Sequence, residues 1–584
     1  MALDDVSMED VQGPVIDRRT SMKLLGAAGL AGLAGCTGDE NGENGGNGGN
    51  GGNGNGGNGN GGAPSSGGVA RIGLNQDHME QGDAARIWGE SEWPIQFHVY
   101  NSLLRLNENQ EIEGELAEDW HNPDDSTYEF ELRDDVDFHN GDHFTAEDVR
   151  WHIERIEEMD DTPYNEVDAI ESIEVPDDYT IRISLEEPYV PFIVYLMAPE
   201  GVGTITNQTA YEDDPEHYQQ YPVGTGPFEL TDRTPGESVT LEAFDDYWDT
   251  DDDGNSLPYL DGIEYQFIPE PSTMWTAVSS GELDLVNENS YDRADAIENH
   301  DDLVLDTMSK GAYKSIQMLC NDAASDEWEE LAQIVAPDRE VTDKWEDEDL
   351  VTDDPRVRRA IALAIDRQEV VDTAWFGYGE PAHSMLVPTM GPFFEREPEN
   401  AQQYDPEEAE RLLDEAGYTG DPRFTVSMLG WQTAWTERFA VVLQEQLADV
   451  GIEAEIDIRS GSEAFDVLLD FEHELFLYAA ANLFTATNHM NNMFMTPVEG
   501  APNGSRNRQL WRDEEFDELS EAAMTTPDID ERSEYIREAE QILLEGTPHA
   551  WVVHDDVVRA RNANLQGIDQ VALMERLHTA YFAD

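Results

Sequence analysis

An alternation of apolar and polar positions predicts strands at two places in the first third of the chain. In "STYEFELR" the apolar side chains of Tyr128, Phe130 and Leu132 recur at every second position, and "YTIRISL", residues 179–185, repeats the pattern. A period of two places these side chains on one face of a strand, which is the face expected to be buried. Both segments are therefore predicted to be strands with one buried face.

Helices are predicted from capping patterns that lie between and after these strands. Thr145 and Asp148 have the spacing of a capping box at the start of "TAEDVRWHIERI". In "DPEEAERLLDEAGY", Asp405 is a predicted N-cap and Gly417 a predicted terminator. The segment "FAVVLQEQLADVGIEAEIDI" predicts an amphipathic helix, a stop at glycine and then a strand. This order of elements indicates a mixed α/β fold.

The N-terminal segment has the three-part form of an export signal. Two arginines, Arg18 and Arg19, precede an apolar run at residues 24–35, which ends at Cys36. As a helix the run is about 18 Å long, whereas the hydrocarbon core of a bilayer is about 30 Å thick. Arg18 and Arg19 indicate the twin-arginine route, and "LAGC" resembles a lipobox whose cysteine is lipidated. The alternative is an ordinary cleaved signal in which Cys36 has no special role.

Residues 37–68 are rich in glycine and asparagine and contain almost nothing that a core could bury. Such a composition predicts a disordered linker, with a span on the order of 30 Å. Residues 1–36 are accordingly assigned to a twin-arginine lipoprotein signal. Lipidation of Cys36 would leave Cys320 as the one other cysteine, so no internal disulfide is expected.

Acidic residues dominate the charged composition of the whole chain. It has 127 Asp and Glu against 33 Lys and Arg, a formal net charge of −94, and 39% hydrophobic residues. The apolar content excludes a disordered acidic polymer. The many carboxylates repel one another, and this repulsion is weakened when molar salt shortens the Debye length to about 3 Å. The protein is therefore expected to come from an extreme halophile. Nucleic acid is excluded as a partner because no basic stripe is present.

Several segments, taken in order, resemble the solute-binding proteins of ABC importers in the peptide, oligopeptide and nickel class, known as family 5. They are "VYNSLLRLNENQEIEGELAEDW", "YEFELRDDVDFHNGDHFTAEDVRW", "YPVGTGPFEL", "VTLEAFDDYW", "LPYLDGIEYQFIPEPSTMWTAVSSGELDLV" and "DDPRVRRAIALAIDRQEVVDTAWFGYGEPAHS". The resemblance implies a two-lobed, periplasmic-binding-protein-like α/β fold of type II, cluster C, with an extra subdomain in lobe one. The implied divisions are lobe one at 69–104 and 222–313, the extra subdomain at 105–221, lobe two at 314–547 and a C-terminal return to lobe one at 548–584.

The resemblance also implies that a ligand binds between the two lobes. Peptide-binding members have a stretch like G-W-x-x-D-Y in lobe two, whose Asp pairs with the peptide's α-amino group. Here Ala480 stands where the Trp would be and Leu483 where the Asp would be, so the amine anchor is missing. A free peptide is therefore a less favoured ligand than a neutral or differently charged solute. The predicted ligand-binding residues are Trp88, Trp151, Trp431, Trp435, Tyr478, Asn482, Asn488 and His489.

Other functions are less consistent with the sequence. His489, Met490 and Met493 form an alternative soft metal site, although packing is the usual role of buried methionine. The chain has no G-x-S-x-G elbow and no zinc-protease helix, so no catalysis is expected, and no cofactor or metal. A surface hydrolase, an adhesin or a surface-layer protein of a halophile stay open as alternatives. The expected partners are a small solute, ABC permease subunits and, through the lipid anchor, the outer face of the cell membrane, with the protein itself a monomer.

Overall fold

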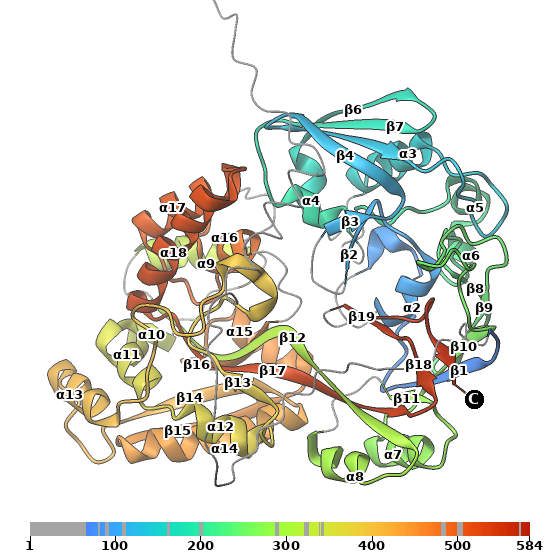
Figure 1. The fold of residues 1–584 in the computed structure, drawn as a ribbon. Helices are drawn as coiled ribbons and strands as arrows, with labels where there is room; N and C mark the ends of the chain where they lie inside the picture. Colours follow the sequence, from blue (N-terminus) through green and yellow to red (C-terminus); the bar gives the residue numbers. More distant parts are fainter. Residues whose placement is uncertain are drawn as a thin grey trace, which may run out of the picture.

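A computed structural model gives the structure of the chain at residues 66–79, 82–87, 93–107, 112–159, 164–197, 202–286, 291–320, 326–337, 339, 344–347, 349–480, 486–498, 506–571 and 574–583. These residues form two lobes that are joined by long strands (Figure 1). The predicted signal, with Arg18, Arg19 and Cys36, lies outside the described residues, as does nearly all of the linker.

One sheet of eleven strands runs through both lobes. Its order is β15-β14-β16-β12-β17-β11-β1-β10-β9-β8, and β13 pairs with β17. The strands are β1 (Val69–Leu74), β8 (Phe228–Thr234), β9 (Ser238–Ala243), β10 (Gly262–Phe267), β11 (Leu285–Val286), β12 (Leu303–Met318), β13 (Gly379–Pro381), β14 (Phe424–Trp431), β15 (Ile452–Arg459), β16 (Leu475–Ala480) and β17 (His549–Asn562).

The antiparallel pair β12 and β17 belongs to both lobes. Toward lobe one Leu303 pairs with Asn562, and toward lobe two Gln317 pairs with His549. Between these ends the register shifts between Ser309 and Tyr313, so extra residues of β12 bulge out against β17. The boundaries expected at 313/314 and 547/548 therefore fall within or beside strands that the lobes share.

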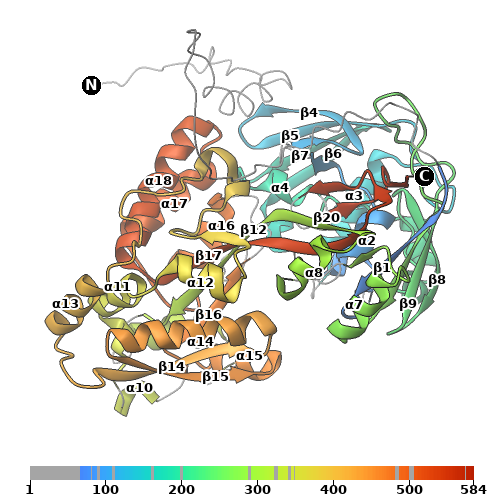
Figure 2. The same ribbon diagram turned by 60° about the horizontal axis from the view of Figure 1, so that its bottom comes forward.

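Lobe two is built on β14, β15 and β16 and is rich in helices. Figure 2 shows α14 lying along β14 and β15. Its helices are α9 (Asp326–Val335), α10 (Lys344–Asp347), α11 (Pro355–Leu363), α12 (Arg367–Ala374), α13 (Pro406–Ala416), α14 (Ala434–Asp449), α15 (Gly461–Leu469), α16 (Ala486–Phe494), α17 (Glu514–Thr525) and α18 (Ile529–Gly546). Two buried apolar clusters occupy the two sides of its sheet.

Lobe one carries a second, four-stranded antiparallel sheet of order β4-β5-β7-β6. The sheet comprises β4 (Ala117–Asp124), β5 (Thr127–Leu132), β6 (Ile170–Asp177) and β7 (Thr180–Leu185), and β2 (Leu104–Leu106) pairs with β3 (Ile112–Gly114) beside it. The helices of this half are α2 (Trp93–Val99), α3 (Ala146–Glu157), α4 (Phe192–Tyr195), α5 (Gln208–Asp213), α6 (Pro215–Tyr218), α7 (Pro271–Ser279) and α8 (Ala294–Glu298). One continuous apolar cluster underlies both sheets of this lobe.

The C-terminal tail packs back onto lobe one (Figure 1). It forms two short antiparallel pairs, β18 (Leu565–Gln566) with β21 (Tyr581–Phe582) and β19 (Asp569–Val571) with β20 (Met574–Arg576). The tail residues Leu565, Leu577 and Ala580 are buried in the lobe-one cluster. The end of the chain thus covers part of the core that its beginning forms.

The predicted local elements are present. Asp148 accepts hydrogen bonds from the backbone and hydroxyl of Thr145, both at 2.9 Å, and so caps α3. Asp405 accepts from the backbone of Glu408 at the start of α13, and Gly417 ends that helix in the left-handed conformation, with φ of 98°. The predicted strands at 126–133 and 179–185 are β5 and β7, whose alternate apolar side chains are buried.

The alternation after α14 is only partly realised. Ile452 and Ala454 of β15 are buried, but Ile456 is 36% exposed. β15 is the edge strand of the sheet, so its far half has a neighbour on one side alone. In the described part of the chain, no helix is both long and apolar enough to span a bilayer, and Cys320 is a buried free thiol.

Candidate ligand-binding site

Two of the predicted aromatic residues lie near the carboxyl ends of neighbouring strands in lobe two. Trp431 is the last residue of β14, and Tyr478 lies near the end of β16. The two strands are parallel, with Met428 opposite Leu475. Ligands of open α/β sheets bind outside the carboxyl ends of parallel strands. The Trp431 ring packs at 4.7 Å from that of Phe476, so this edge is already aromatic.

Tyr478 belongs to a layer of aromatic and histidine side chains. Its ring centroid is 5.6 Å from that of His549, and its hydroxyl donates to the sulfur of Met493 at 3.5 Å. In the same layer the Tyr313 hydroxyl lies 2.8 Å from Nε2 of His489. Burial lowers the pKa of both His489 and His549 to about 3, so both imidazoles are neutral near pH 7. The layer presents polar but uncharged groups.

The helix α16 carries two members of the predicted set, Asn488 and His489. Oδ1 of Asn488 accepts from Nδ2 of Asn492 at 3.2 Å. Met490 and Met493 are buried in the apolar core of lobe two. With Nε2 of His489 occupied by Tyr313, these contacts favour packing over a soft metal site. Within the described ranges, no three His, Cys, Asp or Glu side chains are grouped so that they could hold a metal ion.

The other predicted tryptophans lie apart from this group. Trp435, at the start of α14, packs against Trp375 at 6.3 Å, and Nζ of Lys314 lies 5.4 Å from its ring centroid. Trp151, on α3 in lobe one, packs against Tyr211 at 5.9 Å. Contacts through Phe476 and Tyr313 thus link Trp431, Tyr478 and His489 in lobe two, and Asn488 is the neighbour of His489 on α16. Trp151 and Trp435 lie outside this set of contacts. Trp88, Asn482 and Leu483 lie outside the described residues.

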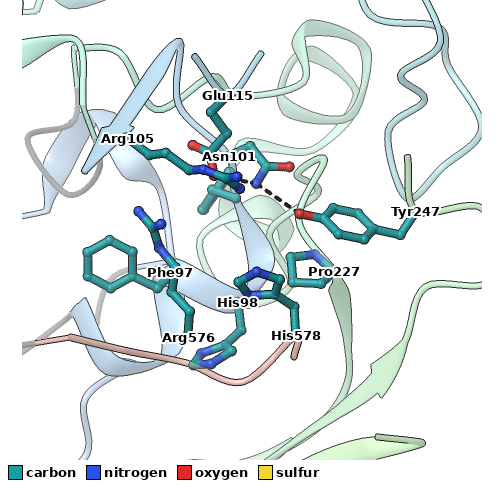
Figure 3. A pocket seen from close by; sticks show the side chains of 10 residues that line it. Phe97, His98, Asn101, Arg105, Glu115, Pro227, Tyr247, Arg576 and His578 are labelled. Carbon is teal, nitrogen blue, oxygen red and sulfur yellow. Dashed lines mark hydrogen bonds between the residues drawn. The ribbon is translucent and has the colours of Figure 1, made fainter. Parts of the chain in front are cut away.

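A polar pocket lies in lobe one where the tail crosses α2 and β2 (Figure 3). It is lined by Phe97, His98, Tyr100, Asn101, Arg105, Glu115, Pro227, Tyr247, Arg576 and His578. None of these residues was predicted from the sequence. The lining comes from segments almost 500 positions apart, and no local pattern marks its members.

The charges in this pocket are largely balanced by carboxylates in it and around it. The carboxylate of Glu115 accepts from Nδ2 of Asn101 at 2.9 Å and from the backbone N–H of Ser102 at 2.7 Å. Burial raises the pKa of Glu115, while the nearby guanidinium groups of Arg576 and Arg105 oppose that rise. Arg105 itself is paired with Glu113 and Asp249. Such a network can fasten the tail to lobe one and hold a small polar group.

One donor in the pocket has no partner in the described part of the chain. Nη1 of Arg576 donates to the carbonyl of Leu106 at 3.1 Å, whereas its buried Nη2 makes no hydrogen bond to a described residue. His98 and His578 are neutral near pH 7, because burial lowers the pKa of His98 to about 4 and holds that of His578 well below its ordinary value. Nη2 can donate a hydrogen bond to a water molecule or to an oxygen of a ligand.

The two lobes also touch away from the connecting strands. The backbone N–H of Val190, in lobe one, donates to the carbonyl of Met524 on α17 at 2.9 Å. Glu166 of lobe one is buried, and burial raises the pKa of its carboxyl. The positive charge of Arg506 in lobe two opposes this rise in part. The positive charge of Arg532 on α18 likewise opposes the rise that burial causes in the pKa of Tyr128 in lobe one. The lobes are therefore close together on the side of α17 and α18.

Sequence reasoning also missed Arg506 and Arg508 in lobe two, whose charges are near enough to act on Tyr478. Their positive charges both act to lower the pKa of the Tyr478 hydroxyl, although burial raises it overall. A signal for them was available, since "RNR" at 506–508 is a rare concentration of positive charge in so acidic a chain.

Comparisons with known proteins agree with this architecture. The family described as "Bacterial extracellular solute-binding proteins, family 5 Middle" matches residues 111–501. The glutathione-binding protein GsiB of Salmonella paratyphi A is 26% identical over 506 residues, covering 85% of this chain and 91% of the relative. GsiB of Escherichia coli is 26% identical over 507 residues, with the same coverage.

Solved structures show the same fold. The periplasmic binding protein DppA of Helicobacter pylori, in complex with the peptide STSA, matches with a TM-score of 0.70 and 21% identity, over 89% of this chain and 98% of that one. The substrate-binding protein CtaP of Listeria monocytogenes matches with a TM-score of 0.72 and 19% identity, over 89% of this chain and 100% of that one.

Proposed function

Since the chain belongs to the extracellular solute-binding proteins of family 5, we propose that it is the lipid-anchored receptor of an ABC importer. In this proposal it captures a small solute between its two lobes and delivers that solute to a membrane permease. Members of the family bind solutes and are not enzymes, which excludes the alternative of a surface hydrolase. The receptor is proposed to act as a monomer, with no cofactor of its own.

The observation that carries the proposal is the way in which the lobes are connected. β12 and β17 pass from one lobe to the other, and the bulge between Ser309 and Tyr313 interrupts their pairing between the two halves. We propose this bulge as the hinge, because an irregular pair of strands bends more readily than a regular ladder. The contact between Val190 and Met524 would then belong to the closed state.

We propose that the solute lies against the carboxyl ends of β14 and β16. Trp431 and Tyr478 provide aromatic faces there, and Asn488 and His489 neutral hydrogen-bonding groups, with Asn482 as a further predicted member. A role of Trp88, Trp151 and Trp435 in ligand binding stays a prediction from the sequence. Ala480, at the end of β16, pairs with Tyr313 and is 6% exposed, so it offers no ring for stacking. A peptide-like solute or an oligosaccharide is the proposed class, and the glutathione named for the relatives belongs to the first.

The proposed location is the outer face of the cell membrane. Arg18 and Arg19 would direct export, lipidated Cys36 would hold the protein, and residues 37–68 would act as a tether. Delivery to a permease is the role that such an anchored receptor fills.

Thermal unfolding in the presence of candidate solutes tests the proposal. The purified protein, in salt above about 1 M, is heated with free peptides, N-acetylated peptides, oligosaccharides or a nickel–histidine complex. A solute that binds only the folded protein stabilises it, by about 2.7 kcal/mol at a concentration of a hundred times Kd, and so raises the thermal midpoint. One solute class is expected to do so. If no class shifts the midpoint at millimolar concentration, the proposed receptor function fails.

A further inference from the structure

Among the residues that the structure describes, Arg508 makes no ion pair, although acidic side chains are abundant in this chain. The sequence has 127 Asp and Glu against 33 Lys and Arg. Arg411 and Arg459 illustrate the usual arrangement, each paired with an acidic neighbour on its own element. The Cζ atom of Arg508 instead lies 4.8 Å above the ring of Phe465, and no described carboxylate or carbonyl accepts a hydrogen bond from its guanidinium. Its fork of donors is unused among the described residues.

The backbone around Arg508 is held firmly, so the side chain is not part of a loose end. The N–H of Arg506 donates to the carbonyl of Asn492 at 2.9 Å. Nε2 of the next residue, Gln509, donates to the carbonyl of Met493 at 2.6 Å, and its own carbonyl accepts from the N–H of Cys320 at 2.8 Å. These bonds fasten the segment to α16 and to the end of β12.

The charge of Arg508 is in an unfavourable environment as it stands. The side chain is partly buried, and burial together with the like charge of Arg506 lowers its pKa, which the Tyr478 hydroxyl opposes only in part. A cation that has lost part of its water without gaining an anion is destabilised. An anionic group that approached both guanidinium groups would relieve the burial and the repulsion together.

Arg508 and Phe465 lie on the side of lobe two where the solute is proposed to bind. Phe465 is on α15, which directly follows the carboxyl end of β15, and Tyr478 is near the carboxyl end of β16. Arg506 acts electrostatically on Glu166 of lobe one, so this segment faces the other lobe. An anion here would lie between the lobes.

We propose that Arg508, with Arg506 and the Tyr478 hydroxyl, binds a carboxylate group of the transported solute. This inference rests on the proposed receptor function and narrows its solute to an anionic one. A guanidinium offers two parallel N–H donors to a carboxylate, and the ring of Phe465 supports its plane from below. With no amine anchor at position 483, the solute would be held mainly by its acidic end.

The test removes the charge of Arg508 and compares each acid with a counterpart whose carboxyl groups are blocked. R508Q and wild type are titrated by calorimetry, above about 1 M salt, with glutathione and its diethyl ester, and with Ser-Thr-Ser-Ala and its C-terminal amide. We expect wild type to bind at least one acid on the order of 10- to 100-fold more tightly than its ester or amide, and R508Q to lose that preference. R411Q, which removes an exposed charge on α13, is expected to keep it.

A measurement without ligand separates recognition from a structural role. Because Arg508 has no anionic partner among the described residues and is destabilised by the charge of Arg506, apo R508Q is expected to unfold at the same temperature as wild type or higher. A midpoint several degrees lower would show that Arg508 supports the fold, and would overturn the inference.

The remaining outcomes separate this inference from the receptor function on which it rests. If wild type binds neutral sugars or esters as tightly as acids, or R508Q keeps the preference for acids, the carboxylate site is wrong and the receptor function stands. If inorganic phosphate binds more tightly than the acids and R508Q loses it, the anion is a phosphate and the inference is likewise wrong. If no solute of any class binds wild type, both proposals fail.

Discussion

Nζ of Lys314 lies 2.9 and 2.8 Å from the two carboxylate oxygens of Asp555, with side chains only 5% and 3% exposed. Lys314 is on β12 and Asp555 on β17, next to the bulge between Ser309 and Tyr313. A buried ion pair therefore joins the two strands that connect the lobes. Such a pair specifies how the strands meet, because either charge left alone would be strongly unfavourable.

Replacing Asp555 by Asn is expected to destabilise the protein, since the ammonium of Lys314 would stay buried without its carboxylate. The expected loss in the free energy of unfolding is about 3 to 5 kcal/mol. Denaturant unfolding in high salt measures it. Asp466→Asn is the matched control, because its pair with Arg339 is exposed and should contribute less than about 1 kcal/mol. Equal effects of the two substitutions would contradict the structural role given to Asp555.

The buried carboxyl group of Glu540 on α18 is expected to make the stability of the protein depend on pH. It is 1% exposed, and burial raises the pKa of its carboxyl to about 7, with Glu395 adding to the rise and the Ser384 hydroxyl and Arg537 opposing it. Between the unfolded pKa of about 4.3 and pH 7 the folded state binds more protons than the unfolded state. The contribution of Glu540 is thus greatest below about pH 4 and is lost as pH rises through 7, on the order of 3 kcal/mol in all.

Glu540→Gln tests this dependence, because the amide imitates the protonated carboxyl. We expect the variant to be more stable than wild type at pH 8 and to differ little from it at pH 4, as measured by chemical denaturation at both values. Glu538→Gln, on an exposed face of the same helix, removes the same charge and should change stability little at either pH. A Gln variant that is less stable at pH 8 would refute the assignment.

The net charge of −94 predicts that salt stabilises the fold. Screening weakens the repulsion among carboxylates as the Debye length falls from about 10 Å at 0.1 M to about 3 Å at 1 M. The thermal midpoint should therefore rise steeply over this range, and potassium and sodium chloride should act alike. A midpoint independent of salt would contradict the halophilic assignment.

Membrane attachment is expected to depend on Cys36. Cys36→Ser should release the protein into the medium or leave the precursor uncleaved, while replacing both Arg18 and Arg19 by Lys should keep precursor inside the cell. Fractionation of the host cells followed by blotting measures both effects. If the serine variant stays attached as firmly as wild type, the lipid anchor is wrong.

The elements that the sequence predicts well are those whose signals are local. Thr145 with Asp148, and Asp405 with Gly417, define helix ends through contacts within a few residues, and the structure confirms them. Ile456 shows the limit of the same reasoning. Its alternation with its neighbours is regular, yet its exposure depends on β15 being an edge strand, which is a property of the whole sheet.

The candidate site was less accessible to prediction from sequence. Trp431 and Tyr478 were found because a strand end and a family motif mark them, whereas Trp435 packs beside the lobe connection for reasons that only the tertiary contacts reveal. The relation of Arg508 to Phe465 joins a loop to a helix some forty residues earlier. The sequence shows that an arginine is present at position 508, but it does not show that no carboxylate of the described residues pairs with it.

The central claim is that the two lobes enclose a solute, and a native mass spectrum tests it most directly. The protein is purified from its own host, exchanged into a concentrated volatile salt and measured before and after unfolding. The account predicts one small molecule per chain that is held by the folded protein and lost on unfolding. Identical masses before and after unfolding, together with no solute that binds when added back, would contradict it.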